Sequence, residues 1–264
     1  MASIRVGIGG WTFPPWRGVF YPPGLPHAQE LAYASEQLTS IEINGTFYGA
    51  QKPESFARWR AETPDGFVFS VKAARATTYR KDPAEAEVAI RRFLESGVTE
   101  LAEKLGPILW QFPPTRKFDP AAFQAFLAML PKAQDGIPLR HVVEARHPSF
   151  VDPAAIALLR RFGVARAMVD SDKQALLGDQ TADFVYARLE RSQEAEADGY
   201  PPADLDHWTD RFRAWSRGRA VTDLPLAEEG ETSKAARDCY VYFISGDKVR
   251  APAAAMAMLG RLRG

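Results

Sequence analysis

The segment Val142–Phe150, with sequence VVEARHPSF, places a carboxylate, a guanidinium and an imidazole where an apolar strand ends. Glu144, Arg146 and His147 lie within four positions, and Pro148 then interrupts the extended chain. One hypothesis is a structural ion pair that closes the strand end. The other is an active site, in which the carboxylate transfers protons and the arginine binds an anionic group.

The same residue types follow other apolar runs of strand length. The polar and aromatic residues at these ends are Trp11, Glu42, Asn44, Tyr48, Lys72, Arg75, Gln111, Asp170, Asp172 and Arg188. A single charged residue at a strand end is usually solvated or paired. Their recurrence at most strand ends favours a shared polar site, because buried charge is costly unless it is paired and isolated ion pairs need not converge.

Residue chemistry suggests a role for each member of this set. The residues predicted to be catalytic are Glu42, Lys72, Glu144 and Asp170. The residues predicted to bind a ligand are Trp11, Asn44, Tyr48, Arg75, Gln111, Arg146, His147 and Arg188. Three alternatives remain: the charges neutralise one another, the aromatic residues close the top of the fold, and His147 only fixes a turn through a backbone hydrogen bond.

Alternation along the strands indicates which way these side chains point. Glu144 and Arg146 are two positions apart and share one face of their strand, as do Glu42 and Asn44. The apolar residues between them suit a layer of helices on the other face. We therefore expect Glu144 and Arg146 to share one pocket with Glu42, Lys72, Asp170 and Arg188.

The elements that must position these residues are eight short apolar runs. They are Ile4–Ile8, Ser40–Asn44, Phe67–Lys72, Ile108–Phe112, His141–Ala145, Arg166–Asp170, Phe184–Arg188 and Tyr240–Ile244. Eight strands alternating with helices in about 250 residues predict an α/β fold of the TIM type, a (β/α)8 barrel formed by residues 1–264 as a single domain. An open doubly wound sheet is the alternative.

Helical segments separate most of these runs. Asp82-Pro83, Asp119-Pro120 and Asp152-Pro153 each combine an N-cap with proline at the first helical position, and Gly163 marks a helix end. The first of these starts predicts a helix over Pro83–Glu103. Further helices are predicted over Ala28–Gln37, Glu54–Glu62, Asp204–Arg217 and Pro252–Leu262, with long loops over Glu190–Pro202 and Gly218–Lys234.

Composition bounds the partners and the compartment. Lysine plus arginine and aspartate plus glutamate both number 33, so net charge gives no reason to expect nucleic acid or an anionic membrane surface. Cys239 is the only cysteine, and an apolar run begins by Ile4, which leaves no room for a signal peptide. We expect a cytoplasmic protein that binds a small molecule, with no membrane segment and an undetermined oligomeric state.

Several reaction classes lack their sequence signals. There is no G-x-S-x-G, P-loop or dinucleotide fingerprint, and His147 is the only histidine near the predicted site. No metal is therefore predicted, and no cofactor can be named. Three function classes stay open: an enzyme acting on a small anionic or sugar-like ligand, a metal-dependent phosphodiesterase or nuclease, and a ligand-binding barrel without catalysis.

Motifs along nearly the whole chain resemble the YecE-like family, domain of unknown function 72. They are GGWTFPPW, SIEINGTFYG, FVFSVKAAR, LGPILWQFPP, VEARHPSF, Asp170-Ser171, VYARL and YVYF. The resemblance implies a TIM-barrel fold, in agreement with the strand count, and implies no reaction. The chain departs from the family pattern at Tyr79, at Glu190 and at Ile244-Ser245, where two histidines and an asparagine pair are usual.

The departure at Glu190 bears on the charge of the ligand. If Arg188 stays unpaired, the site should bind an anion through that guanidinium. If Glu190 captures Arg188, the site should prefer a neutral polar ligand. The expectation from the sequence is an unpaired Arg188.

Overall fold

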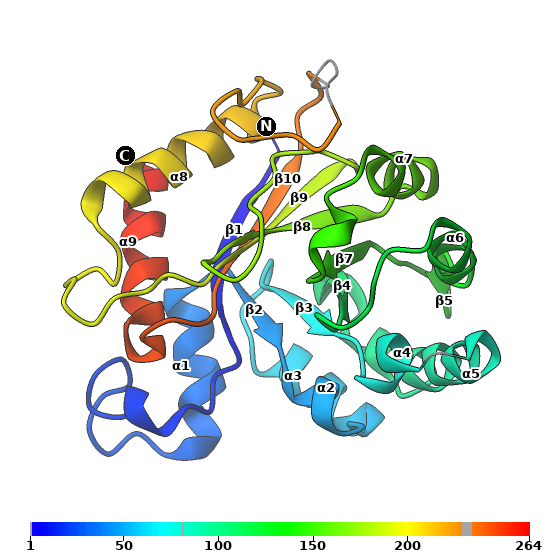
Figure 1. Ribbon diagram of the computed structural model, residues 1–264. Coiled ribbons are helices and arrows are strands. Elements are labelled where there is room, and N and C mark those ends of the chain that lie inside the picture. Colours follow the sequence, from blue (N-terminus) through cyan, green and yellow to red (C-terminus); the bar gives the residue numbers. More distant parts are fainter. Residues whose placement is uncertain (1, 81, 229–233) are drawn as a thin grey trace.

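A closed barrel of eight parallel strands forms the centre of the computed structural model, which describes residues 2–80, 82–228 and 234–264 (Figure 1). The strands are β1 (Ile4–Gly9), β2 (Ser40–Ile43), β3 (Val68–Lys72), β4 (Leu105–Phe112), β7 (His141–Ala145), β8 (Ala165–Asp170), β9 (Phe184–Leu189) and β10 (Asp238–Phe243). Their order around the barrel is β1-β10-β9-β8-β7-β4-β3-β2, which is the order along the chain. The predicted (β/α)8 barrel is confirmed, each predicted run supplies a strand, and the open sheet is wrong.

Helices surround this barrel (Figure 1). They are α1 (Glu30–Gln37), α2 (Gly45–Tyr48), α3 (Pro53–Ala61), α4 (Ala76–Tyr79), α5 (Pro83–Leu94), α6 (Pro120–Ala128), α7 (Pro153–Phe162), α8 (Pro202–Ser216) and α9 (Ala251–Arg263). Short 3-10 helices cover Pro14–Trp16, His27–Gln29, Val98–Lys104, Pro148–Phe150 and Lys248–Arg250. A two-stranded sheet of β5 (Ala133–Gln134) and β6 (Ile137–Pro138) lies outside the barrel and was not predicted.

The predicted helix starts are confirmed at α5, α6 and α7. The side chains of Asp82, Asp119 and Asp152 each accept a hydrogen bond from a backbone N–H of the first turn, at 2.7 to 2.9 Å. Gly163 ends α7 in the left-handed conformation, with φ of 65°. These caps depend only on local sequence, which is why sequence patterns locate them.

The predicted single helix over Pro83–Glu103 is wrong. α5 ends at Leu94, and a 3-10 helix covers Val98–Lys104 before β4 begins. Gly97 lies between them with φ of 97°, and a Cβ there would come within 2.6 Å of the Pro53 Cα at the start of α3. The chain turns at this glycine because only a residue without a side chain fits against α3 in that conformation.

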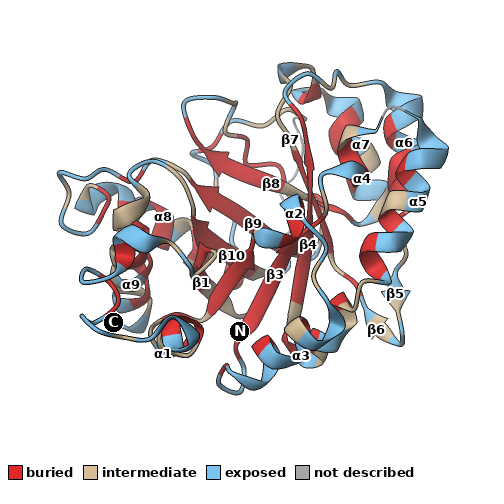
Figure 2. Ribbon diagram, turned by 90° about the horizontal axis from the view of Figure 1, so that it is seen from below, coloured by how far each residue is buried: buried red, intermediate tan, exposed pale blue. Residues whose placement is uncertain are grey.

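Two apolar layers hold the barrel together. One fills the interior and is centred on Tyr186, Tyr242, Val142 and Val169. The other lies between strands and helices, so the strands are buried while the helices bury one side and expose the other (Figure 2). Because each strand is covered on both faces, the strands appear in the sequence as short, nearly continuous apolar runs.

Gly7 of β1 lies against the backbone of β2. A Cβ at this position would lie 1.8 Å from the carbonyl oxygen of Ser40. We expect Gly7→Ala to lower the free energy of unfolding by about 1–3 kcal/mol, because the two strands must separate. Gly260→Ala, on α9 with nothing near the added atom, should instead stabilise by up to about 1 kcal/mol. Urea unfolding of both variants checks this, and equal effects would contradict it.

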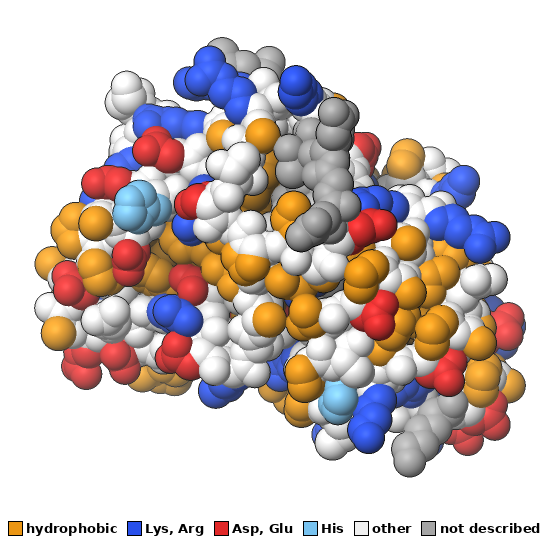
Figure 3. Space-filling view, turned by 45° about the horizontal axis from the view of Figure 1, so that its top comes forward, with side chains coloured by type: hydrophobic (Ala, Val, Ile, Leu, Met, Phe, Trp, Pro, Cys, Tyr) orange, Lys and Arg blue, Asp and Glu red, His pale blue; other side chains and the backbone are white. Residues whose placement is uncertain are grey.

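The surface agrees with a balanced composition. Lys and Arg side chains alternate with Asp and Glu over the face shown in Figure 3, with hydrophobic side chains between them. Within the described residues, no helix is both long enough and apolar enough to cross a membrane.

Candidate functional site

Charged and amide side chains meet inside the barrel at the C-terminal ends of its strands. We call this set the mouth cluster: Glu42, Lys72, Gln111, Glu144, Arg146, Arg188 and Glu190. Strand pairing brings its members together, since Gln111 lies opposite Glu144 between β4 and β7. Glu42, Glu144 and Arg188 are 0%, 1% and 2% exposed, so the cluster is desolvated at its base.

Arg188 on β9 is the centre of the mouth cluster. Its Nε and Nη2 donate to the two carboxylate oxygens of Glu42, both at 3.2 Å. Its Nη1 donates to Glu144 at 2.6 Å and to Glu190 at 3.0 Å. Burial opposes the charge, but the attraction of Glu144 and the other carboxylates outweighs it and raises the pKa of Arg188. The expectation that Arg188 stays unpaired is therefore wrong.

Glu144 is held on both of its oxygens. Gln111 Nε2 donates to each at 3.0 Å, and Arg146 Nε donates to Oε1 at 2.6 Å. Burial alone would raise the pKa of Glu144, but the charges of Arg188 and Arg146 lower it to about 2. The structural ion pair predicted for the VVEARHPSF segment forms, and it lies within the mouth cluster. An active site at this segment stays a prediction.

A layer of hydroxyl groups supports this cluster from below. Tyr186 donates to Glu42 Oε2 at 2.6 Å, and its hydroxyl lies 2.8 Å from Ser70 Oγ. Tyr242 and Ser40 make the equivalent contact at 2.8 Å. Burial and the charge of Glu42 raise the pKa of Tyr186, which keeps this donor protonated. Sequence reasoning missed these residues, although Tyr186, Ser70 and Ser40 each lie two positions before a cluster member.

Lys72 on β3 differs from the other cations of the cluster. Its side chain is 7% exposed, and its Nζ lies 4.1 Å from the centre of the Phe47 ring. Within the described ranges, no hydrogen-bond acceptor contacts this amine and no carboxylate oxygen lies within 4.0 Å. Burial, followed by repulsion from Arg188, lowers the pKa of Lys72 to about 8.

Glu190 joins the cluster from just beyond β9. Its side chain is mostly buried, and burial raises its pKa even though Arg188 counteracts the shift. The sequence identified Glu190 as a departure and as a possible partner of Arg188, but not as a site residue. Strand alternation could have identified Glu190, because residues two positions apart share one face and Glu190 follows Arg188 by two positions.

Asp170 does not share the mouth, and that expectation is wrong. In the pairing of β8 with β9, Val169 lies opposite Arg188, whereas Asp170 lies opposite Leu189 on the helix side. The Asp170 carboxylate accepts from Trp208 Nε1 on α8 and pairs with Arg191, both at 3.1 Å. Burial raises the pKa of Asp170 against the attraction of Arg191.

His147 fixes the turn after β7 through a backbone hydrogen bond, which was one of the alternatives from the sequence. Its Nδ1 accepts from the backbone N–H of Ser149 at 3.1 Å and lies 2.8 Å from the Ser149 hydroxyl.

Trp11 and Asn44 line a groove of about 500 Å³ beside α1 and α3, apart from the mouth cluster. Trp11 packs edge-on against Trp59, with ring centres 5.1 Å apart.

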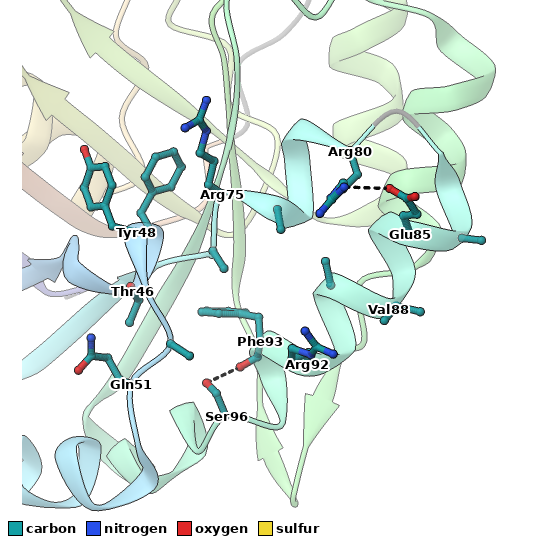
Figure 4. Close-up of a pocket in the computed structure, with 17 residues that line it drawn as sticks. Thr46, Tyr48, Gln51, Arg75, Arg80, Glu85, Val88, Arg92, Phe93 and Ser96 are labelled. Atoms are coloured by element: carbon teal, nitrogen blue, oxygen red, sulfur yellow. Dashed lines mark hydrogen bonds and ion pairs between the residues drawn. The ribbon is translucent and has the colours of Figure 1, made fainter.

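Tyr48 and Arg75 line a further groove, which is largely apolar, has a volume of about 750 Å³ and lies between α2, α4 and α5 (Figure 4). Phe93 projects into it from α5, and the Arg80–Glu85 ion pair closes one side. Tyr48 is 84% exposed, and Arg75 stacks over Tyr79 at 4.5 Å. The Lys72 amine and the Glu190 carboxyl, whose pKa values are shifted, lie in the mouth cluster and do not line this groove.

Metal and thiol chemistry find no support in the geometry. Among the residues that the structure describes, no group of three or more His, Cys, Asp and Glu side chains is placed to hold a metal ion. Cys239 is buried in β10, and burial raises the pKa of its thiol to about 12. A thiol in this state is a packing group.

The whole barrel matches one family model. Residues 5–264 match the family described as "Protein of unknown function DUF72". The chain belongs to the DUF72 family. The predicted resemblance is thereby confirmed, and the mouth cluster described above is a feature of a DUF72 barrel.

Curated relatives and solved structures of DUF72 proteins agree with this assignment. The chain is 28% identical over 175 residues to UPF0759 protein YecE of Escherichia coli K12, covering 64% of this chain and 59% of that protein. It therefore spans less than two thirds of that relative's length. The crystal structure of a DUF72 family protein from Thermotoga maritima superposes with a TM-score of 0.76 at 24% identity, over 99% of this chain and 100% of the other. A DUF72 protein of Enterococcus faecalis gives 0.71 at 17% identity, over 100% and 99%. Both likenesses show the fold.

Proposed function

We propose that this DUF72 barrel is an enzyme that binds a small, neutral, sugar-like molecule at the mouth and transfers protons through Lys72 and Glu190. One observation carries the proposal: Arg188 is enclosed by three carboxylates, while the Lys72 amine on the same inner surface has no partner in the described part of the chain. The cluster thus combines a fixed charge framework with one available amine.

The charges of the mouth cluster favour a neutral ligand. Glu42, Glu144 and Glu190 supply three negative charges, and Lys72, Arg146 and Arg188 supply three positive charges, so the formal sum is zero. Arg146 and Arg188 already donate to these carboxylates. An incoming anion would have to displace a buried carboxylate from its guanidinium, which is costly because the carboxylate would be left unpaired.

The same contacts redistribute the catalytic roles. Glu144, with a pKa of about 2, is ionised at neutral pH and does not donate a proton. Glu42 is bound by Arg188 and Tyr186 and orients the framework. Burial lowers the pKa of Lys72 to about 8, so this amine changes protonation state near neutrality, and burial raises the pKa of Glu190 from its ordinary value. These two groups are the acid and base of the proposal.

A thermal-shift screen tests the ligand class. We expect neutral pentoses and hexoses to raise the melting temperature by several degrees at saturating concentration, because a ligand at 100 times its Kd stabilises by about 2.7 kcal/mol. Phosphate, sulfate and sugar phosphates should act no more strongly than sodium chloride at equal ionic strength.

Two variants make this screen specific. Glu190→Gln should reduce the sugar-induced shift, whereas Glu103→Gln, at an exposed ion pair with Arg60, should leave it unchanged. Stabilisation by anions alone would overturn the neutral-ligand proposal. NMR of the incubated sugar measures turnover. A sugar that stabilises the protein but is recovered unchanged would indicate a ligand-binding barrel without catalysis.

A further inference from the structure

Two lysines among the described residues are buried, Lys72 and Lys104, and only Lys104 is hydrogen-bonded. Lys104, 4% exposed, donates from its Nζ to the carbonyl oxygens of Arg60 and Thr63 at 2.8 and 2.6 Å. Lys72 has no comparable acceptor among the described residues, and its Nζ is not sealed from solvent. Among the described residues, the amine of Lys72 faces the Phe47 ring and the charges of the mouth cluster.

The strand order sets Lys72 against the acidic wall of the mouth. β3 and β9 are separated by three strands on either side of the closed barrel, so they lie opposite each other. One layer below, Ser70 of β3 and Tyr186 of β9 touch across the interior at 2.8 Å. A small molecule above that layer would have the Lys72 amine on one side, and Arg188 and Glu190 on the other.

Resting on the proposed function, we infer that Lys72 is a nucleophile that forms a Schiff base with a small aldehyde or ketone, such as the open-chain form of a sugar. A lysine amine held among apolar groups and near another cation is the arrangement that activates it for this chemistry. The inference names the substrate class of the same site as carbonyl compounds.

The step balances without a further reactant. The lone pair of the neutral Lys72 amine attacks the carbonyl carbon, and the C=O bond opens to give a carbinolamine. One proton on nitrogen moves to the oxygen overall, and a second proton, taken up from solvent and passed on by Glu190, lets that oxygen leave as water. The product is a protonated C=N bond to Nζ, whose positive charge stays beside the Glu42 and Glu144 carboxylates.

The lowered basicity makes the amine available near neutrality. With a pKa of about 8, about one tenth of Lys72 is neutral at pH 7, several hundred times more than for an unperturbed lysine. The rate of adduct formation should therefore rise with pH and level off above pH 8. The charges that control this titration are Arg188, Glu42, Glu144 and Arg146, all within the mouth cluster.

Reductive trapping tests the inference. The protein of residues 1–264 is incubated with glycolaldehyde or dihydroxyacetone, and sodium cyanoborohydride then reduces any C=N bond to a stable amine by donating hydride. We expect mass spectrometry of the intact protein to show one adduct, and peptide mapping to place it on Lys72. The adduct should form at least tenfold faster there than on Lys104.

Variants separate reactivity from folding. Lys72→Arg keeps the positive charge but has no nucleophilic amine, so it should melt close to the wild-type temperature and lose the adduct. Lys104→Arg should keep the adduct on Lys72. Lys248 is the alternative amine, since it lies over Phe13 and Trp16 near the start of α9 and burial lowers its pKa too.

The outcomes also separate this inference from the proposed function. No adduct above the Lys72→Arg background, or an adduct confined to Lys248, would overturn the Schiff base even if neutral sugars stabilise the protein. An adduct on Lys72 with no stabilisation by neutral sugars would leave the Schiff base standing and refute the neutral sugar-like ligand.

Discussion

Arg188→Met is expected to lower the free energy of unfolding by about 3–5 kcal/mol at pH 7. The guanidinium contacts Glu42, Glu144 and Glu190, and two of these carboxylates are at most 1% exposed. Methionine fills a similar volume but leaves these charges buried without a counter-ion, which is the condition in which breaking a buried pair costs most. Urea unfolding at pH 7 measures the loss.

A matched change at the surface provides the control for Arg188→Met. Arg60 pairs with Glu103 at 2.7 Å, but both side chains are well exposed, so Arg60→Met should have only a small effect. The loss in Arg188→Met should also shrink at acidic pH, because protonation neutralises the stranded carboxylates. A loss equal to that of Arg60→Met at pH 7 would show that Arg188 does not balance the buried charge.

Glu144→Gln is expected to cost about 3 kcal/mol at pH 7 and less in acid. The pKa of Glu144 falls from 4.5 in the unfolded chain to about 2 in the fold, because the attraction of Arg188 and Arg146 exceeds the effect of burial. A depressed pKa stabilises the fold above pH 4.5 and loses this contribution as the pH falls toward 2. Glutamine keeps the shape but has no charge, so it lacks the contribution at every pH.

The difference between wild type and Glu144→Gln should therefore narrow on acidification. Linkage gives a decrease of roughly 1.4 kcal/mol between pH 7 and pH 3.5. Denaturant titrations at several pH values measure it, with Glu87→Gln on the exposed side of α5 as the matched control. A difference that stays constant over this range would show that the Arg188 and Arg146 charges do not stabilise ionised Glu144.

Local patterns were enough to predict the barrel and every member of the mouth cluster except Glu190. Strands buried on both faces appear as short apolar runs, and Asp-Pro starts mark helices, so the element order can be derived without tertiary information. Alternation along the strand placed Glu42 and Glu144 on inner faces, because alternation is a property of each strand alone. The predicted length of the helix that begins at Pro83 was wrong, because the chain turns at Gly97, where it contacts Pro53 of α3.

Asp170 shows where alternation carries no information. Its strand, Ala165–Asp170, has apolar residues on both faces, so the pattern favours neither side for the final carboxylate. The pairing of Val169 with Arg188 decides the matter and directs Asp170 toward Trp208. The register between neighbouring strands determines whether the Asp170 side chain points into the barrel or toward the helices, and that register depends on residues far apart in the chain.

Residue types and their places along the chain predict that carboxylates, guanidinium groups and one lysine gather at the strand ends of a TIM-type barrel. The pairing of these groups follows from the three-dimensional fold. Arg188 on β9 reaches Glu42 on β2 and Glu144 on β7 at sequence separations of 146 and 44 residues, and Lys72 is left without a partner in the described structure. Pairing depends on distances of a few ångströms between side chains from separate strands, and closure of the barrel sets those distances.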